Sequence, residues 1–378
     1  MQFRHPRAVA LLLAGALAAG QAAFWLLPRE TLSEKEKRVL AAAPQPTAAS
    51  LADGSLFADI DRYLADHFPG REALVGLNAY QRQAEGQNAV GEIVRGADGW
   101  LFPAPVSADR QILWDNMQAI TAFAAQQDAP VYLMAVPSAG AVVSDKLPRL
   151  HLPYPDDTLL EEARRLAGDS VQWVDLLEAF READRPETLY YRTDHHWTTA
   201  GAYRAYARLM EEKQASSVPQ EAFAVERAPG FYGTSYAKSG LWLTAPDTLE
   251  LWTDPALQAT VTVYDANREE PVTQQGLYFR AYLEQADKYP VFLSGNHARV
   301  HIETNADSDR RLLVVKDSYA HALAPFLAEE YRTIDLIDLR YFKRQTISDW
   351  LAENPADEIL FVYGLSSLTG DTALQWLA

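Results

Sequence analysis

The strongest constraint on the fold is the alternation of short apolar segments with segments of helical periodicity. The short segments are bounded by proline, glycine or charged residues, as strands buried in a parallel sheet tend to be. Strands that alternate with helices are typical of layered α/β proteins, in which the helices cover the faces of the sheet. The sequence therefore predicts an α/β sandwich with a mainly parallel sheet. The expected strands are residues 130–136, 170–174, 290–293, 311–315, 333–339 and 358–363, and the expected helices are residues 112–127, 158–166, 200–212, 319–331 and 346–352.

Two parts of the chain depart from this alternation. Residues 246–304 contain strand-like pieces joined by polar turns, so we expect an antiparallel β-rich insertion within the α/β domain. Residues 29–53 are rich in alanine, proline and glutamate and show little apolar periodicity, which is typical of a linker. The folded domain is therefore expected to cover residues 54–378.

Residues 1–28 have the layout of a membrane-targeting segment. Arg4 and Arg7 precede an uncharged, largely apolar stretch at 8–27, and a basic head before an apolar run is typical of an export signal. About 20 apolar residues are enough to span a bilayer, whereas small residues near the end of the stretch would suit a signal peptidase. We expect a membrane anchor or a cleaved signal peptide, with the body outside the cytoplasm. A buried core helix is the alternative.

The composition argues against two kinds of chemistry. The chain has 34 basic and 51 acidic residues, a formal charge of -17. Nucleic-acid binding draws its affinity from lysine and arginine, so no nucleic-acid partner is expected. The absence of cysteine removes disulfides, thiolate metal sites and a cysteine nucleophile together. A nucleophile must then be another residue type.

The densest polar cluster lies at residues 190–198, directly before an expected helix. In an extended backbone alternate side chains share a face, so Asp194 and His196 point the same way while His195 points away. A carboxylate bound to one ring nitrogen fixes the tautomer of an imidazole and leaves the other nitrogen free to accept a proton from a hydroxyl. Asp194 and His196 are therefore candidates for an acid and base pair.

A candidate hydroxyl is that of Ser318, which follows the expected strand at 311–315 and begins the next expected helix. A serine at a strand-to-helix junction lies beside backbone N–H groups that can stabilise an oxyanion. The alternative is that Ser318 or Asp317 only caps the helix.

A metal site is the competing interpretation of the polar cluster. Asp194, His195 and His196 are all possible ligands, but adjacent histidines diverge on an extended chain and the helical H-x-x-x-H spacing is missing. We therefore expect no metal and no other cofactor.

The sequence T-D-H-H-W-T-T-A-G-A-Y at 193–203 resembles the signature of the DHHW proteins. These are similar to the alginate O-acetylation proteins of the AlgX and AlgJ type, extracytoplasmic relatives of the SGNH hydrolases. The resemblance also covers G-A-D-G-W-L-F at 96–102, V-P-S at 136–138, K-L-P at 146–148, F-Y-G-T-S-Y-A-K-S-G at 231–240, K-D-S-Y-A-H-A-L-A-P-F-L at 316–327 and I-D-L-R-Y-F at 337–342.

The resemblance implies an SGNH hydrolase-like three-layer sandwich and a triad of Ser318, His196 and Asp194. In that triad Ser318 attacks an acyl carbonyl, His196 moves the proton and Asp194 steadies the imidazolium. The resemblance also implies a polysaccharide substrate and a membrane-bound O-acyltransferase partner that delivers the acyl group.

Two details of the resemblance concern the surroundings of Ser318. Gly295 and Asn296 resemble a G-N pair of the DHHW proteins and are candidate oxyanion donors, with a plain asparagine turn as the alternative. SGNH hydrolases carry glycine before Asp-Ser, whereas this chain has Lys316, so the turn is expected to differ.

Aromatic and basic residues flank the same segments and are candidates for substrate binding. Aromatic rings beside polar groups suit the apolar faces of sugars, and the two cations could meet an anionic glycan. Core packing for the aromatic residues and surface ion pairs for the cations are the alternatives. The candidates are Tyr191, Arg192, Trp197, Tyr232, Tyr236 and Lys238.

Three functions fit the sequence. The first is an extracytoplasmic O-acyltransferase that acetylates an envelope or exported polysaccharide through an acyl-serine. The second is a polysaccharide acetylesterase with the same triad. The third is a non-catalytic glycan-binding scaffold subunit of a modification complex.

Overall fold

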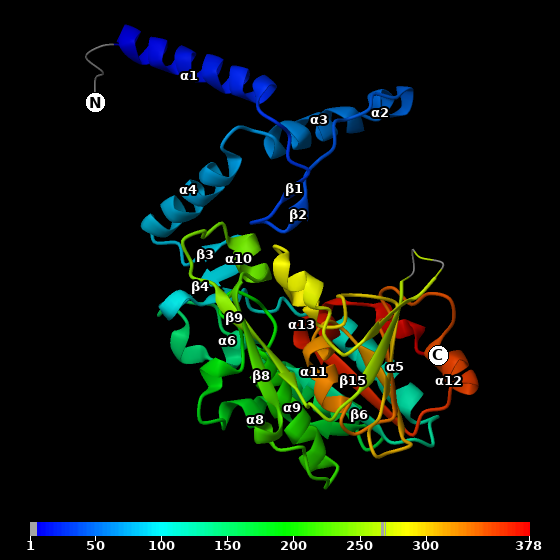
Figure 1. Cartoon of the computed structure of the whole chain (residues 1–378). Coiled ribbons are helices and arrows are strands. Elements are labelled where there is room, and N and C mark those ends of the chain that lie inside the picture. The colour runs from blue at the N-terminus through cyan, green and yellow to red at the C-terminus, as the bar shows by residue number, and fades with distance from the viewer. Residues whose placement is uncertain (1–5, 266–267, 269) are drawn as a thin grey trace.

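A mixed β-sheet forms the centre of the protein in the computed structural model, which describes residues 6–265, 268 and 270–378 (Figure 1). Over these residues the sheet has eight strands in the order β11-β10-β12-β14-β13-β15-β6-β7. The strands are β6 (Val131–Val136), β7 (Gln172–Val174), β10 (Ala259–Tyr264), β11 (Val272–Gln275), β12 (Arg299–Thr304), β13 (Arg311–Lys316), β14 (Thr333–Ile337) and β15 (Glu358–Gly364).

The sheet is parallel on one side and antiparallel on the other. The strands from β14 to β7 pair in parallel, whereas β12, β10 and β11 pair antiparallel and extend the sheet beyond β14. The sheet is therefore more mixed than the sequence predicted. The antiparallel strands come from the segment 246–304, and they join the central sheet edge to edge.

Two helical layers cover the sheet because each central strand is apolar on both faces. In β13, Leu312 and Val314 face one layer, while Leu313 and Val315 face the other. The first layer contains α8 (Leu176–Arg181), α9 (Thr199–Glu212) and α11 (Ala320–Leu327). The second contains α5 (Arg110–Ala124), α7 (Asp156–Ala167), α12 (Ile347–Glu353) and α13 (Leu365–Gly370). The predicted α/β sandwich is confirmed.

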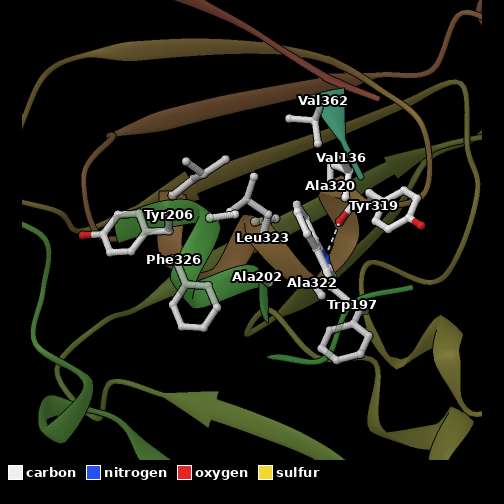
Figure 2. Close-up of a cluster of buried hydrophobic side chains, with 14 of the residues drawn as sticks. Val136, Trp197, Ala202, Tyr206, Tyr319, Ala320, Ala322, Leu323, Phe326 and Val362 are labelled. Atoms are coloured by element: carbon white, nitrogen blue, oxygen red, sulfur yellow. Dashed lines mark hydrogen bonds between the residues drawn. The ribbon is translucent and has the colours of Figure 1, made fainter. Parts of the chain in front are cut away.

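The first layer is held by packed aromatic side chains between α9 and α11 (Figure 2). Tyr206 of α9 stacks on Phe326 of α11 with 5.9 Å between ring centroids. Trp197 is fully buried, and its Nε1 donates to the carbonyl oxygen of Tyr319 at 3.1 Å. The hydrogen bond of Trp197 fixes the start of α9 against the start of α11, and the Tyr206–Phe326 stack packs the two helices together further along.

The start of α9 is also determined locally. Thr198 is the N-cap, and its side chain accepts a hydrogen bond from the backbone N–H of Gly201 at 3.1 Å. Gly201 is packed so closely that a Cβ there would lie 2.2 Å from the carbonyl oxygen of Leu189. The polar cluster before α9 therefore has a fixed exit into the helix.

One predicted strand is wrong. Residues 291–293 are buried as expected, but Tyr289–Val291 form a 3-10 turn and only Phe292 makes an isolated bridge, to Tyr278. Pro290 cannot donate to a strand ladder, and a short buried apolar run does not by itself distinguish a strand from a buried turn.

The N-terminal elements lie at one end of the molecule, above the sheet in Figure 1. Residues 29–53 contain the short β1–β2 pairing and α2, and Arg38 pairs with Asp66 of α3. None of the helices in the described part of the chain is both long and apolar enough to cross a bilayer. These elements are α1 (Pro6–Leu26), β1 (Leu32–Ser33), β2 (Arg38–Val39), α2 (Ala48–Ala52), α3 (Ser55–Asp66) and α4 (Arg71–Ala84).

Smaller elements complete the fold around the central sheet. Two of them, β8 and β9, form a long antiparallel ribbon, and three short strands form a separate small sheet. The smaller elements are β3 (Ala89–Val90), β4 (Ile93–Arg95), β5 (Leu101–Pro103), α6 (Ala139–Val142), β8 (Ala224–Phe231), α10 (Thr234–Ser239) and β9 (Asp247–Thr253).

The second helical layer gives a stability test. Phe361 of β15 is fully buried and packs edge-on against Phe123 with 5.9 Å between ring centroids, so Phe361→Ala leaves a cavity. We expect the free energy of unfolding to fall by about 3–5 kcal/mol. The matched control is Phe57→Ala, because Phe57 is 63% exposed and its truncation is expected to cost less than about 0.5 kcal/mol. Urea unfolding of both variants measures the difference, and equal losses would contradict the assignment of this core.

Candidate active site

Ser318 lies at the carboxyl end of β13, in the turn that leads into α11. The preceding Asp317 holds this turn in place. One Asp317 oxygen accepts from the backbone N–H of Tyr319 at 3.0 Å. The other accepts from the N–H of Gly364 at 2.8 Å and from Ser367 Oγ at 2.7 Å. The turn is therefore tied to the end of β15, while the Ser318 side chain stays partly exposed.

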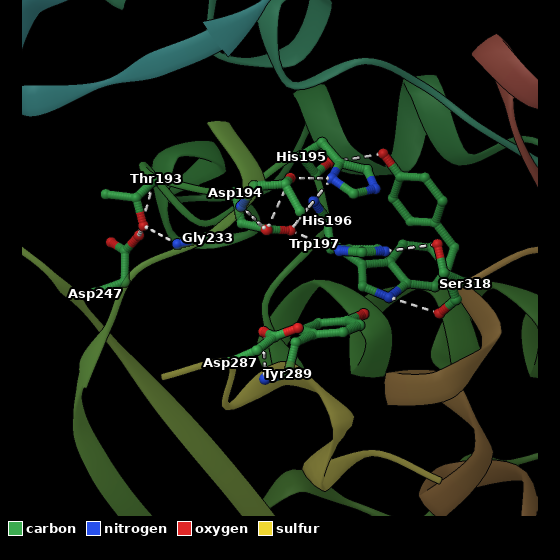
Figure 3. A network of polar contacts seen from close by, with 12 residues as sticks. Thr193, Asp194, His195, His196, Trp197, Gly233, Asp247, Asp287, Tyr289 and Ser318 are labelled. Carbon is green, nitrogen blue, oxygen red and sulfur yellow. Dashed lines mark hydrogen bonds and ion pairs between the residues drawn. The ribbon is translucent and has the colours of Figure 1, made fainter. Parts of the chain in front are cut away.

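Ser318, His196 and Asp194 form a continuous hydrogen-bonded chain (Figure 3). His196 Nε2 lies 2.7 Å from Ser318 Oγ, and His196 Nδ1 lies 2.6 Å from Asp194 Oδ1. His196 and Asp194 are buried. With Asp194 fixing the Nδ1–H tautomer, His196 Nε2 is the acceptor that faces the hydroxyl. The geometry lets His196 remove the Ser318 proton as the oxygen attacks an electrophile.

Asp194 is held as a carboxylate by donors on all sides. Its Oδ1 also accepts from the His196 backbone N–H at 2.9 Å, and its Oδ2 accepts from the Thr234 N–H at 2.6 Å and the Thr234 hydroxyl at 3.1 Å. Burial by itself raises the pKa of Asp194. The imidazoles of His196 and His195 and the Thr234 N–H outweigh burial and hold this pKa well below its usual range.

The ring of His196 is also clamped by aromatic side chains. Tyr289 stacks on it with 4.0 Å between centroids and 10° between planes. Tyr319 approaches it edge-on at 5.2 Å, and the Tyr319 hydroxyl donates to the carbonyl oxygen of His195 at 2.7 Å. These contacts leave the imidazole little freedom to turn away from Ser318.

A second set of hydrogen bonds ties the polar cluster to its neighbours. The backbone N–H and hydroxyl of Thr193 donate to Asp247 Oδ2 at 2.8 and 2.6 Å. Gly233 N–H donates to the Thr193 hydroxyl at 3.1 Å. A Cβ at Gly233 would lie 2.2 Å from the Cβ of Asp194, so only glycine fits beside this carboxylate.

The three residues considered as metal ligands are committed to hydrogen bonds. One ligand atom each from Asp194, His195 and His196 lies within 4.8 Å of the others. However, both ring nitrogens of His196 are engaged, and His195 Nδ1 is 2.6 Å from the hydroxyl of Thr234. A metal would have to displace these contacts, so the donor set fits a proton-transfer chain better than a metal site.

Three of the predicted substrate-binding residues have structural partners instead. Trp197 and Tyr191 are buried in the core, which leaves them no surface to offer to a sugar. Arg192 Nε pairs with Asp247 at 3.1 Å, and its NH2 group donates to the Pro246 carbonyl. The alternative of core packing therefore applies to Trp197 and Tyr191, and the alternative of an ion pair applies to Arg192.

The other candidates for substrate binding lie on or beside α10. Tyr236 is buried, and Tyr232 is half-buried with its ring 4.2 Å from that of Tyr236. The Lys238 side chain is 63% exposed and is 3.8 Å from Glu92. Lys238 and Tyr232 keep an accessible surface, and their role in binding stays a prediction.

The predicted oxyanion donors lie in the turn after the Tyr289–Val291 segment. Gly295 has a φ of +92°, a left-handed conformation that favours glycine. Asn296 is exposed, and its Oδ1 accepts from Arg340 at 3.4 Å. Their role as donors to an oxyanion also stays a prediction.

Sequence reasoning missed the supporting roles of Thr234 and Tyr289, and it considered Asp317 only as a helix cap. Thr234 lies within the segment 231–240 that resembles the DHHW proteins, and this resemblance was the available signal. Tyr289 was hidden because the following residues were expected to form a strand. Its contact with His196 joins residues 93 positions apart, and such a contact has no signature in one sequence.

A comparison with protein families finds one match over half of the chain. The model of the family described as SGNH hydrolase-like domain, acetyltransferase AlgX, matches residues 93–286. This range contains Asp194 and His196 but ends before Ser318.

Individual relatives and solved structures agree with this match. A protein described as "Probable alginate O-acetylase AlgJ" from Azotobacter vinelandii is 24% identical over 192 residues, 47% of this chain and 49% of that protein. The chain therefore spans about half the length of this curated relative. A crystallised DHHW family protein from Eubacterium siraeum is 25% identical with a TM-score of 0.61, covering 74% of this chain and 92% of that one. Bacillus cereus PatB1, solved with a sulfonyl adduct, is 23% identical with a TM-score of 0.64, covering 76% and 98%, and shows a shared fold.

The close approach of Gly233 to Asp194 can be tested by adding one methyl group. Gly233→Ala is expected to displace the carboxylate and lower the kcat for p-nitrophenyl acetate by about 10²-fold, because a misplacement near 1 Å costs about that much. The matched control is Gly370→Ala, where a Cβ meets nothing within 4 Å and no change is expected. Equal activity of the two variants would show that the packing beside Asp194 does not matter.

Proposed function

The chain belongs to the family described as SGNH hydrolase-like domain, acetyltransferase AlgX. We therefore propose that it is an O-acetyltransferase that works through an acyl-serine at Ser318. The observation that carries this proposal is the chain of contacts from Ser318 Oγ through His196 to Asp194, at 2.7 and 2.6 Å. This is the arrangement by which a buried carboxylate and imidazole activate a hydroxyl.

In the first half of the proposed reaction, Ser318 Oγ attacks the carbonyl carbon of an acetyl donor and His196 Nε2 takes its proton. Asp194 stabilises the imidazolium that forms. The tetrahedral intermediate then collapses, the donor oxygen leaves with the proton from His196, and an acetyl ester of Ser318 remains. The backbone N–H of Tyr319 already donates to Asp317 and that of His321 to the Ser318 carbonyl oxygen, so the donor to the negative charge that develops on the acyl oxygen is another group.

In the second half, a hydroxyl of the acceptor attacks the acetyl-Ser318 ester. His196 Nε2 takes the proton of that hydroxyl and returns it to Ser318 Oγ as the ester bond breaks. The acceptor leaves with the acetyl group and the triad is restored. Water in place of the acceptor would make the same site an esterase.

We propose a polysaccharide outside the cytoplasm as the acceptor. Two observations support this substrate class: the export-like layout of residues 1–28 and the similarity to a protein described as a probable alginate O-acetylase. A membrane-bound O-acyltransferase is the proposed source of the acetyl group, as the resemblance to the AlgX and AlgJ type implies.

The role of Ser318 is tested by substitution and covalent labelling. Ser318→Ala is expected to lower the release of p-nitrophenol from p-nitrophenyl acetate by at least about 10³-fold. Phenylmethylsulfonyl fluoride is expected to label Ser318 of the unmodified protein, as read by peptide mass spectrometry. Ser216→Ala, a change at an exposed serine, is the control and should keep full activity and labelling. Full activity of the Ser318 variant would rule out the acyl-serine.

Transfer and hydrolysis are separated by the product. We expect an oligosaccharide incubated with the protein and p-nitrophenyl acetate to gain acetyl groups, in amounts that rise with acceptor concentration. Mass spectrometry of the sugar and an acetate assay measure the two fates. Acetate alone at every acceptor concentration would support the esterase, and glycan binding without labelling of Ser318 would support the scaffold.

A further inference from the structure

A buried charged cluster lies beside the turn that carries Ser318. Lys316 Nζ is 2.8 Å from His321 Nε2 and 3.2 Å from Asp338 Oδ2. Lys316, His321 and Asp338 are each exposed by 2% or less. The guanidinium of Arg340 binds Asp338 through two nitrogens, at 2.9 and 2.6 Å. The proposed mechanism uses none of these groups.

The cluster lies on the face of the sheet that also carries His196. Side chains alternate along β13, so Lys316 shares the face of Leu312 and Val314, which is covered by α9 and α11. Asp338 directly follows β14, and its contact with Lys316 places its carboxylate on this face as well. The ring of Tyr289 connects the two groups, with its centroid 4.0 Å from that of His196 and 6.4 Å from that of His321.

The contact between Lys316 and His321 spans the nucleophile turn. Lys316 ends β13 two residues before Ser318, and His321 belongs to the first turn of α11 three residues after it. A side-chain bridge therefore joins the two ends of the segment that must hold Ser318 Oγ within reach of His196. A glycine at position 316, as in SGNH hydrolases, could not make this bridge.

The bridge also fixes the tautomer of His321. Burial and the nearby Lys316 hold the pKa of His321 well below its usual range, so the ring is neutral near pH 7. Burial lowers the pKa of Lys316, and the Asp338 carboxylate opposes this shift by favouring the ammonium form, which donates to His321 Nε2. A neutral imidazole that accepts at Nε2 carries its proton on Nδ1.

That Nδ1–H group is a buried donor without a hydrogen-bond partner among the described residues. The ring of Tyr289 stacks on His196, and its buried hydroxyl also has no hydrogen-bond partner among the described residues. Buried polar groups are almost always paired, so unpaired ones beside a proposed nucleophile point to a ligand. Because Lys316 occupies Nε2, Nδ1 is the ring nitrogen of His321 that is left for a ligand.

We propose that His321 is a further catalytic residue whose Nδ1–H donates to the oxygen of the acyl group on Ser318, and that Lys316 is the positioning residue that fixes this tautomer. This inference rests on the proposed acyl-serine function. Asp338 does not need Lys316 for neutralisation, because Arg340 already binds both of its oxygens. We therefore assign the role of Lys316 to its contact with His321.

The tautomer is tested directly by nitrogen-15 NMR of the histidine rings in the full chain. His321 is expected to show the Nδ1–H form, and Lys316→Met is expected to convert it to the Nε2–H form that free imidazoles favour. Lys316→Arg keeps a cation and is expected to preserve Nδ1–H. An Nε2–H signal in the unmodified protein would overturn the proposal. This measurement does not depend on activity, so it tests the contact between Lys316 and His321 even if the acyl-serine function itself fails.

Catalysis gives the second measurement, with p-nitrophenyl acetate as the probe. His321→Phe removes the donor and is expected to lower kcat by about 10²-fold with little change in KM. His321→Gln can accept from Lys316 and donate to the acyl oxygen, so its kcat is expected to be about tenfold higher than that of His321→Phe. Lys316→Met is expected to lower kcat about as much as His321→Phe does. Lys343→Met, a change at an exposed lysine, is the control.

The outcomes separate the two proposals. If Ser318→Ala removes activity but His321→Phe keeps the full kcat, the acyl-serine stands and the role of His321 is overturned. If the His321 variants and Lys316→Met lose activity equally, through KM or through unfolding seen by circular dichroism, the cluster is only structural and the proposal is also overturned. If Ser318→Ala keeps full activity, the proposed function fails first.

Discussion

The site depends on a buried carboxylate that stays ionised. Asp194 lies in the interior, where burial alone would favour its neutral form. The Thr234 N–H and hydroxyl and the His196 N–H and Nδ1 supply the hydrogen bonds that replace water around it. Because the donors belong to two residues, His196 before α9 and Thr234 at the start of α10, the carboxylate also fixes the loop before α9 against the start of α10. The buried Asp194 carboxylate therefore holds the His196 imidazole in position, and His196 in turn contacts Ser318 Oγ.

The sheet topology brings the remaining groups to this point. Parallel strands end at the same edge, so the turn after β13 and the end of β15 meet there, and Asp317 joins them through Gly364 and Ser367. The antiparallel strands extend the sheet on the far side of β14, and the Tyr289–Val291 turn comes from the same stretch of chain. Tyr289 thereby reaches His196 from a segment that has no strand partner in the central sheet.

Much of the fold and the centre of the site could be predicted because both leave local patterns. The buried strands around Ser318 are short apolar runs with clear boundaries, and the alternation of Asp194 and His196 is visible in three consecutive residues. The predicted strand at residues 290–293 was wrong because a buried turn and a buried strand have the same apolar composition. Trp197 and Tyr191 were candidates for sugar binding, but an aromatic ring beside polar groups looks the same in sequence whether it faces solvent or the core.

The sequence by itself determined the α/β class and the absence of thiol chemistry, because both depend on residue type or on spacing within a few positions. Local patterns also offered Asp194, His196 and Ser318 as separate candidates, and the resemblance to the DHHW proteins implied that the three belong together. Only the tertiary structure decided that Ser318 Oγ lies 2.7 Å from His196 Nε2, that Tyr289 stacks on the His196 ring, and that Lys316 contacts His321 across the turn that carries Ser318. These contacts join side chains through packing and burial, and the energy of a buried polar contact depends on every element that excludes water from it.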